Sequence, residues 1–480
     1  MHEGKKIAID AINENKTVFT SLSDRIWEYA ELSLKEHRST EDYVRVLKEL
    51  GFSVEENVAG IPTAFLGKFG QGRPIIGILG EYDALSGLSQ EGGSACKKEL
   101  VKGGNGHGCG HNMLGAGALA AAYGVKCYLE RTAKSGTVIF YGTPGEEGGA
   151  GKAFMAKEGL WRGLDCALTW HPDDSNEVTT GTCNSCIQVL YKFKGVASHA
   201  AGDPEDGRSA LDAVELMNVG VQYLREHTKD DARIHYAIID GGGFSPNVVQ
   251  PTASVLYMVR SKRVADALEL QARVDKIAEG AALMTETSFD RIFIDGCSGT
   301  VPNHVLEKLL WTNMNDLGAD SYTDEEWAFA EEIKKTYTTH SLPTLAAQYD
   351  PVSREYVEKL THGGKKALND FIAPLYSEDC FSPGSTDVGD VSWQTPTAQC
   401  HALCFTSGSP GHSWQNVSVG KTSIGHKGLL FAGRVIASTA IDLFEDPSIL
   451  LSARAEFEQR AKEGYTCPIP DGEYAKTIDL

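Results

Sequence analysis

The alternation of apolar, strand-like runs with helical stretches constrains the fold of this 480-residue chain most strongly. The strand-like runs lie at 62–69, 74–79, 137–141, 165–170 and 402–406. Helical spacing is found at 24–50, at 112–130, in a short stretch near Lys152, and at 422–444. Strands that alternate with helices build βαβ units, so the sequence predicts an α/β fold with a mixed, largely parallel sheet flanked by helices.

A different order of elements interrupts this alternation between residues 187 and 294. Strand-like and helical stretches follow one another as β-α-β-β-α-β at 187–193, 208–227, 232–239, 252–260, 264–282 and 286–294. This is the ferredoxin-like order, and a complete module inside a larger α/β chain predicts an inserted α+β domain. We therefore expect a catalytic domain in two parts, 1–184 and 299–480, with an inserted domain at 185–298 and a polar helical insertion at about 306–373.

The composition excludes several classes of function. A formal net charge of −20 argues against nucleic acid as a partner, because phosphate backbones are bound by basic patches. The N-terminus carries no apolar stretch typical of a secretory signal, and the least polar long stretch, 113–129, is too short and too mild to span a membrane. The eleven scattered cysteines do not resemble a disulfide framework, and the single CxxC pair, Cys183 and Cys186, is weak evidence for a metal or redox site, so we expect a cytoplasmic protein.

Residues that bind metal ions recur in five loops, and four of these loops follow a strand-like run. The residues are Glu81 and Asp83, Cys109 and His111, Glu146 and Glu147, His171, and His412. In open α/β sheets, sites form at the carboxyl ends of the strands. The glycines on both sides of Cys109 permit a tight turn in which Cys109 and His111 face one centre, so the sequence predicts a metal site at this edge.

The adjacent pair Glu146 and Glu147 suits metal-assisted hydrolysis. Neighbouring side chains diverge in an extended segment, so one carboxylate can bind a metal while the other faces the substrate. A metal lowers the pKa of water towards about 7, and a nearby glutamate can take the proton and pass it to the leaving amine. A cysteine hydrolase, with Cys109 as nucleophile and His111 as base, is an alternative that leaves the glutamates without a role.

Four motifs resemble a known family. They are Gly-Cys-Gly-His-Asn at 108–112, Pro-Gly-Glu-Glu-Gly-Gly at 144–149, Trp-His-Pro at 170–172 and Ser-His-Ala-Ala at 198–201. Together they are similar to the two-metal exopeptidases that include aminoacylase, bacterial glutamate carboxypeptidase and the auxin-conjugate amidohydrolases. Stretches at 241–250 and 385–393 are similar to the branch of this family that hydrolyses p-aminobenzoyl-glutamate, and the resemblance spans nearly the whole chain. It implies a zinc-exopeptidase-like catalytic domain with an inserted lid or dimerisation domain.

The resemblance also implies roles for individual residues. Glu146 matches the general base, and we expect Asp83 to orient a metal ligand. His199 matches a histidine that reaches a neighbouring subunit's site and polarises the scissile carbonyl, while Asn247 and Arg260 match residues that hold a substrate carboxylate. The implied ligands of two divalent ions, manganese or zinc, are Cys109, His111, Glu147, His171 and His412.

The implied activity is hydrolysis of the amide bond in an N-acyl amino acid, with p-aminobenzoyl-glutamate as the expected substrate. A broader aminoacylase or dipeptidase is one alternative, and a partner subunit in a hetero-oligomer is another. The presence of Glu146 and of all five candidate ligands favours a working catalyst, which we expect to be a homodimer or to pair with a homologous chain.

Three positions depart from the family pattern. Glu81 stands where many members carry a histidine ligand, Asn112 replaces an aspartate, and Ser-Thr-Asp-Val-Gly-Asp at 385–390 replaces a Glu-Asp-Phe segment. Whether Glu81 contacts a metal therefore stays open. Spacing alone does not distinguish His412 from His426 as the last ligand.

Overall fold

The computed structural model describes residues 2–178, 180–338, 350–376 and 378–477. The chain forms two compact units. The first comprises Met1–Gly181, Val301–Phe381 and Val391–Tyr465, and the second comprises Thr182–Thr300, Ser382–Asp390 and Thr466–Leu480. The largest segment of the second unit lies where the sequence predicts the inserted domain, and two C-terminal segments join it.

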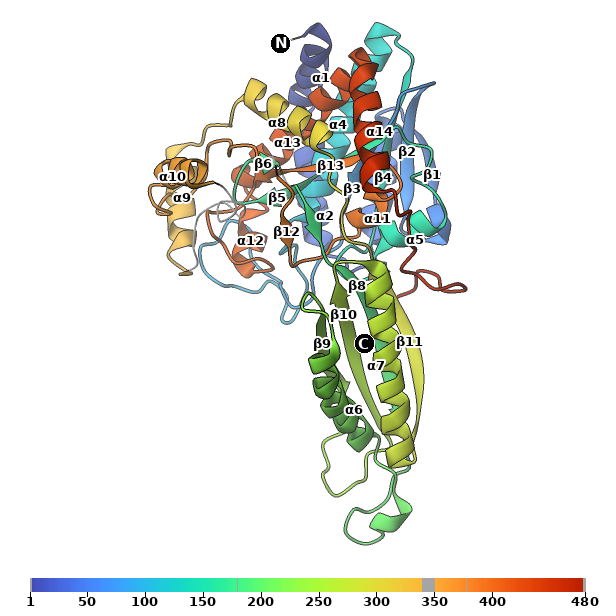
Figure 1. Ribbon diagram of the computed structural model, residues 1–480. Helices are drawn as coiled ribbons and strands as arrows, with labels where there is room; N and C mark the ends of the chain where they lie inside the picture. The colour runs from blue at the N-terminus through green and yellow to red at the C-terminus, as the bar shows by residue number, and fades with distance from the viewer. Residues whose placement is uncertain (1, 179, 339–349, 377, 478–480) are drawn as a thin grey trace. The chain divides into compact units, whose positions relative to one another are not determined.

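A seven-stranded sheet forms the centre of the first unit (Figure 1). Its strands are β1 (Ser53–Glu56), β2 (Phe65–Gln71), β3 (Ile75–Gly80), β4 (Gly136–Gly142), β5 (Cys166–Asp173), β6 (Glu177–Val178) and β13 (Thr397–Leu403). Their order is β1-β2-β4-β3-β5-β13-β6. The four central strands pair in parallel, whereas β1, β2 and β6 pair antiparallel at the edges. This mixed, largely parallel sheet confirms the predicted α/β class.

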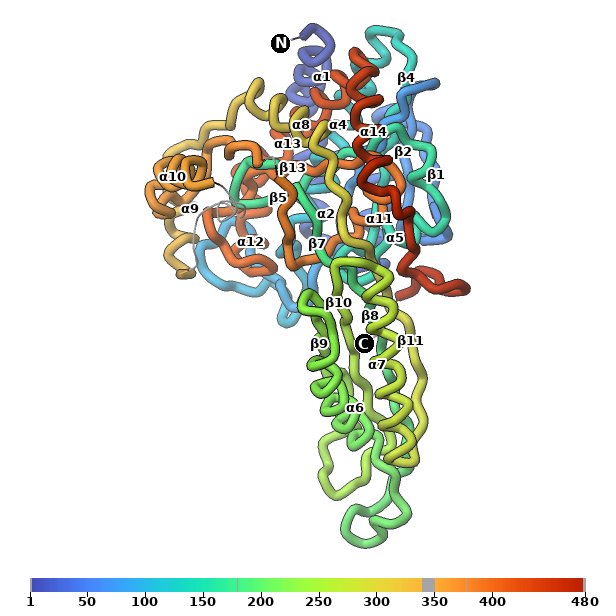
Figure 2. Tube along the Cα trace, in the orientation of Figure 1, coloured from blue at the N-terminus to red at the C-terminus, as the bar shows by residue number. Residues whose placement is uncertain are grey.

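Two long helices pack against each other and against the central strands. They are α4 (His111–Thr132) and α13 (Ser423–Glu445). The Gly- and Ala-rich sequence of α4 permits this close packing, because a Cβ on Gly117 would lie 2.8 Å from the carbonyl oxygen of Leu429. Figure 2 shows α1 (Glu3–Glu14) beside these two helices, which it also contacts.

The other helices of the first unit are shorter and lie around this centre. They are α2 (Lys16–Tyr29), α3 (His37–Glu49), α5 (Gly151–Lys157), α8 (His304–Leu317), α9 (Asp324–Lys334), α10 (Pro351–Leu360), α11 (Val388–Ser392), α12 (Trp414–Val419) and α14 (Pro447–Arg460), of which α11 begins in the second unit. The expected helical insertion at about 306–373 contains α9, α10 and most of α8, and its residues 339–349 lie outside the described residues. None of the described helices is both long and apolar enough to cross a lipid bilayer.

Two strands differ from the expectation in a way that matters for the site. Strand β5 continues to Asp173, so His171 lies within the strand and not directly after it. Strand β13 occupies Thr397–Leu403, so the expected strand at 402–406 was placed too late. Both errors have one cause: polar residues near the ends of these strands weaken the apolar signal that marks a buried strand.

The second unit contains a four-stranded antiparallel sheet with two helices. Its elements are β8 (Ser185–Lys194), α6 (Ala210–Leu224), β9 (Arg233–Asp240), β10 (Thr252–Ser261), α7 (Val264–Thr285) and β11 (Ser288–Cys297). The strand order is β11-β8-β10-β9, and α6 packs against α7. This is the predicted ferredoxin-like order of elements. Two further strands of two residues each, β7 (Thr182–Cys183) and β12 (Phe381–Ser382), pair with each other.

Candidate metal centre

His111 stands within a buried cluster of polar side chains in the first unit. It is the first residue of α4 and has no exposed surface. Its Nδ1 lies 2.9 Å from Asp83 Oδ1. Asp83 in turn accepts a hydrogen bond from Ser33 Oγ at 2.7 Å and from the Glu147 amide at 2.9 Å. Asp83 therefore fixes the orientation of the His111 ring and leaves Nε2 to face the centre of the cluster.

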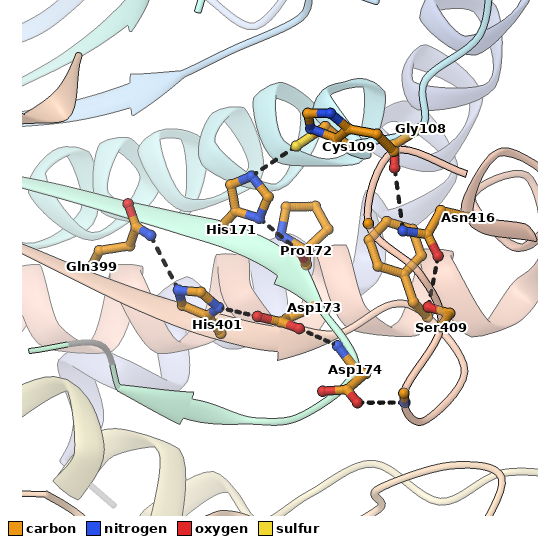
Figure 3. Close-up of a pocket in the computed structure, with 14 residues that line it drawn as sticks. Gly108, Cys109, His171, Pro172, Asp173, Asp174, Gln399, His401, Ser409 and Asn416 are labelled. Carbon is orange, nitrogen blue, oxygen red and sulfur yellow. Dashed lines mark hydrogen bonds and ion pairs between the residues drawn. The ribbon is translucent and has the colours of Figure 1, made fainter. Parts of the chain in front are cut away.

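Cys109 lies in the tight turn that leads into α4. Gly110 has a φ of +82°, and a Cβ there would lie 2.8 Å from Phe405 Cζ and 3.0 Å from Pro172 Cβ. Only glycine combines this backbone conformation with so little space. The turn brings Cys109 Sγ to 3.4 Å from His171 Nε2 on β5, a contact that Figure 3 shows.

The five expected ligands meet in two groups that share Cys109. Cys109, His111 and His171 offer ligand atoms within 4.8 Å of one another, and so do Cys109, Glu147 and His412. His412 Nε2 lies 3.5 Å from Glu147 Oε1. Two groups with one common sulfur are an arrangement that can hold two neighbouring divalent ions.

Glu146 belongs to a third group beside the first two. A carboxylate oxygen of Glu146 lies within 4.8 Å of a carboxylate oxygen of Glu81 and of a ring nitrogen of His111. Glu81 Oε2 is 3.2 Å from His111 Nε2, and Glu81 Oε1 is 2.7 Å from Lys152 Nζ. Lys152, on α5, is fully buried, and a buried ammonium group requires such a partner. The sequence analysis did not identify Lys152 as a site residue. Its position in a Gly- and Ala-rich stretch was the one signal that could have drawn attention to it.

The electrostatics of the cluster favour metal ligation over nucleophilic catalysis by the thiol. Burial, together with His111 and His401, lowers the pKa of His171 to about 4, so its ring is neutral and can bind a metal at neutral pH. Burial raises the pKa of the Cys109 thiol above its usual value, although His111 lowers it. A thiol with a raised pKa is a poor nucleophile, whereas a bound divalent ion would deprotonate it.

Two buried atoms test whether the cluster suits a cation. Among the described residues, His111 Nε2 and Glu147 Oε1 are buried and form no hydrogen bond, although Glu81 Oε2 lies 3.2 Å from the first and His412 Nε2 lies 3.5 Å from the second. Burial raises the pKa of Glu147, although His111 lowers it. A buried polar atom without a partner is destabilising by about 1–3 kcal/mol, and ligation to a metal would satisfy both atoms. The mixed nitrogen, oxygen and sulfur donors fit zinc, and the carboxylates also tolerate manganese.

The structure distinguishes His412 from His426. His426 Nε2, on α13, lies 2.8 Å from Asp24 Oδ1 and belongs to none of the ligand groups in the described residues. His412 has a φ of +51°, a left-handed conformation that is uncommon in residues other than glycine and often marks functional sites.

Asn112, which departs from the family pattern, donates to Ser23 Oγ at 3.0 Å and to the Gly420 carbonyl at 3.3 Å, so it anchors α4.

The remaining expected site residues lie in the second unit. His199 is exposed, and its Nδ1 accepts hydrogen bonds from the amides of Ala201 and Gly202 at 3.2 and 2.9 Å. The ring proton is therefore on Nε2, which can donate. The Asn247 carbonyl accepts from the Ala200 amide at 2.9 Å, so Asn247 lies beside the His199 turn. Arg260, near the end of β10, donates to Ser385 Oγ at 2.8 Å.

A pocket of about 520 Å³ in the first unit adjoins the metal ligands. Cys109, His171 and His412 contribute to its lining, as do Asp173 and His401. Figure 3 shows His171 between Cys109 and His401. Asp173 and His401 are functional candidates that sequence reasoning missed, because both lie on strands whose ends it did not place correctly.

The sequence matches a family of peptidases. The model of peptidase family M20/M25/M40 matches residues 77–477, and the chain belongs to this family. The chain is accordingly a metal-dependent amidohydrolase that acts on amide bonds other than the peptide bonds of ordinary proteins.

One curated relative is similar along its whole length. The chain is 45% identical, over 475 residues, to one of the subunits of p-aminobenzoyl-glutamate hydrolase from Escherichia coli (strain K12), with 98% of each chain covered. Two solved structures share the fold. An aminobenzoyl-glutamate utilization protein from Klebsiella pneumoniae has a TM-score of 0.58 at 15% identity, covering 90% of this chain and 97% of its own. The YXEP protein of Bacillus subtilis, described as a dinuclear metal-binding peptidase, has a TM-score of 0.53 at 16% identity, covering 90% and 99%.

Proposed function

We propose that the chain hydrolyses the amide bond of p-aminobenzoyl-glutamate or a close N-acyl amino acid, giving the free acid and the amino acid. The observation that carries this proposal is the pair of ligand groups that share Cys109, with Glu146 beside them. The near full-length similarity to the Escherichia coli p-aminobenzoyl-glutamate hydrolase chain supports the choice of substrate.

The proposed ligands of two divalent ions are Cys109, His111, Glu147, His171 and His412, and Asp83 orients His111. Bound there, the ions would acidify water towards a pKa of about 7 and polarise the scissile carbonyl. Zinc and manganese both suit this donor set, and we propose one of these two metals.

Glu146 is the proposed general base and acid. Its carboxylate takes a proton from the attacking water and later transfers it to the leaving amine nitrogen. Glu147, directly beside it in the chain, has the different task of a ligand, since its Oε1 faces His412. The Asp83 contact to the Glu147 amide holds this segment in place, so the two carboxylates keep distinct directions.

The substitution Glu146→Gln tests this assignment. We expect the turnover number to fall by about 10²–10⁴-fold, while the content of bound metal stays at the wild-type value. Glu158→Gln, an exposed glutamate beyond α5, is the matched control and should leave turnover unchanged. Wild-type turnover by Glu146→Gln would contradict the assignment. The proposed substrate would be contradicted if the unmodified enzyme hydrolysed other acyl-amino acids but did not hydrolyse p-aminobenzoyl-glutamate.

Substrate recognition is proposed for Asn247 and Arg260. A guanidinium group pairs bidentately with a carboxylate, which supplies a local cation in a chain of net charge −20. Arg260→Ala should raise the Michaelis constant for an acyl-glutamate much more than that for an acyl-alanine. An equal change for both substrates would remove Arg260 from this role.

His199 is proposed to act in the site of a second subunit, either another copy of this chain or a homologous chain. Its Nε2 proton is directed to donate, as polarising a carbonyl requires. Mixing His199→Ala with Glu146→Gln tests this directly, because a mixed dimer contains one site with both residues intact. We expect each variant alone to be inactive and an equal mixture to recover about a quarter of wild-type activity. A mixture without activity would refute action between two copies of this chain.

The cellular location is also a proposal. All eleven cysteines are free in the structure, including the exposed Cys96. Free thiols persist in a reducing compartment, so we propose a cytoplasmic enzyme.

A further inference from the structure

The pocket beside the metal ligands contains a polar group that the proposed hydrolysis does not use. Asp173, at the end of β5, and His401, on the neighbouring strand β13, both line it. Asp173 Oδ2 lies 2.5 Å from His401 Nδ1, and Gln399 Nε2 lies 3.1 Å from His401 Nε2 (Figure 3). Both ring nitrogens of His401 are therefore engaged, which fixes the ring and, through it, the Asp173 carboxylate.

A second carboxyl group stands behind this pair. Glu177, on β6, is the cross-strand partner of His401 and is only 2% exposed. Its ligand atom lies within 4.8 Å of those of Asp173 and His401, and among the described residues its Oε2 is buried without a hydrogen-bond partner. Burial and the neighbouring Asp173 raise the pKa of Glu177 to about 8. Glu177 therefore keeps its proton near neutral pH, and Asp173 is the carboxyl group of the two that lines the pocket.

The carboxylate of Asp173 keeps capacity for a ligand. Its side chain is 23% exposed, and it forms part of the pocket lining. Oδ1 accepts from the Asp174 amide at 2.7 Å and Oδ2 contacts His401, so each oxygen retains a second lone pair. An amino group in the pocket can donate to either oxygen.

The walls between this carboxylate and the metal ligands suit a flat aromatic group. Phe405 and Pro172 supply apolar surface, and Gly108, Gly408 and Gly411 add no side chains. The rings of His171 and His401 are 5.9 Å apart between centroids. This separation is similar to the span from the carbonyl carbon to the para nitrogen of an aminobenzoyl group. A group of that length, with its carbonyl at the proposed metal ligands, can extend its amine towards Asp173, which lines the same pocket.

We propose that Asp173, held by His401, binds an amino group on the acyl part of the substrate and so selects aminoaryl acyl groups over unsubstituted ones. This inference rests on the proposed function and adds a residue that determines its specificity. A site that hydrogen-bonds a substrate NH rejects the analogue that lacks it, because the acceptor is then left without its partner. Asp173 therefore contributes to discrimination between substrates, while Glu146 and the ligands carry out the reaction on either one.

The kinetic test compares p-aminobenzoyl-glutamate with benzoyl-glutamate, which differ only in the para amine. We expect the wild type to prefer the amino compound by about 10- to 100-fold in kcat/KM, as a hydrogen bond to a charged group provides. Asp173→Asn should reduce this ratio to near one, mainly through the rate for the amino compound, and His401→Gln should reduce it partly. Asp10→Asn, exposed on α1, should leave the ratio unchanged.

Three results would overturn the inference while leaving the proposed function intact. One is a wild type that hydrolyses both substrates equally well. Another is an Asp173→Asn variant that loses both rates in proportion, as a purely structural role would cause. The third is a bound metal ion that the wild type holds and the Asp173→Asn variant lacks, because the group would then be a ligand set for a further cation.

A binding measurement separates failure of the inference from failure of the function. Calorimetric titration of p-aminobenzoate and of benzoate into the metal-loaded protein requires no turnover. Tighter binding of the amino compound by the wild type, abolished in Asp173→Asn, supports the inference even if p-aminobenzoyl-glutamate is not hydrolysed. Equal binding of both acids by the wild type refutes it whatever the substrate is.

Discussion

The two units of this chain differ in the energetically unfavourable groups that gather in them. The first unit buries charge: Glu81, Asp83 and Lys152 are at most 3% exposed and lie together at the metal centre. The second unit exposes apolar surface, including Tyr223 at 73% and Leu283 at 81%. Buried charge is tolerated only when every member has a partner, and exposed apolar surface only when something covers it. The first pattern indicates preorganised chemistry, and the second indicates association.

The apolar surface of the second unit has a regular pattern. Leu216, Val219 and Tyr223 are exposed on α6 at positions i, i+3 and i+7, which lie on one face of a helix. Strand β9 is an edge of its sheet and exposes Tyr236 and Ile238. Edge strands and apolar helical faces of this kind bind other chains. They support the proposed pairing of subunits.

Replacing the buried cationic side chain of Lys152 should give the largest effect. It tests the statement that the first unit tolerates buried charge because each charged group has a partner. Lys152→Met leaves Glu81 buried beside His111 without its ammonium partner. We expect the free energy of unfolding to fall by about 3–5 kcal/mol, because an uncompensated buried charge remains. Denaturant unfolding measures this, and metal content should fall with it as the charge of Glu81 disturbs the centre.

Two further variants sharpen that measurement. Lys126→Met is the matched control, because Lys126 is also nearly buried but pairs with Glu130, whose side chain is 58% exposed. Its effect should stay below about 1 kcal/mol, as for exposed ion pairs. The double substitution Glu81→Gln with Lys152→Met should recover much of the lost stability. If it recovers none, Lys152 stabilises the unit through packing and not through its charge.

A charge on the apolar face of the second unit should give a smaller effect, and on association, not on folding. Tyr223→Glu is expected to weaken subunit association at least tenfold, a change of about 1.4 kcal/mol, with little change in the stability of the unit. Sedimentation at a series of concentrations measures this. Glu226→Gln, a short distance along the chain, is the control and should leave association unchanged. If the variant associates as the wild type does, this face is not the contact surface.

The last effect depends on pH and concerns a buried carboxyl group of the second unit. Burial raises the pKa of Asp295 to about 6, although Gln188 donates to both carboxylate oxygens at 3.0 Å. The folded state thus binds this proton more tightly than the unfolded chain, whose carboxyl titrates near pH 3.8. The stability that it contributes is present below pH 4 and is lost as the pH rises through about 6.

Asp295→Asn removes that titration. The variant should match the wild type near pH 4 and exceed it above pH 6 by about 1–3 kcal/mol, at about 1.4 kcal/mol per pKa unit. Unfolding midpoints between pH 4 and pH 8 check this. Asp290→Asn, at an exposed pair with Lys194, should show no such divergence. Parallel curves for Asp295→Asn and the wild type would show that Asp295 titrates normally.

Much of the architecture could be predicted because its signals are local. Periodicity identified the five longer strands of the central sheet and the β-α-β-β-α-β order. It misplaced ends of β5 and β13, did not identify the short edge strands β1 and β6, and treated 24–50 as one helical stretch although α2 ends at Tyr29 and α3 begins at His37. The turn around Cys109 was predictable because the glycines leave few alternative conformations. The pairing of Asp173 with His401 was not predictable, because neither residue belongs to a motif and the two are 228 positions apart in the chain.

The sequence by itself determined the fold class and the residue types around the centre, because hydrophobic period and glycine placement act over a few neighbouring residues. Only the tertiary structure decided which of these residues meet. It grouped His412 with Cys109 and Glu147 and paired His426 with Asp24. It also gave Glu81 its buried partner, Lys152. The physical reason is that a metal centre depends on distances between side chains from separate strands, and these distances are set only when the sheet and its helices pack.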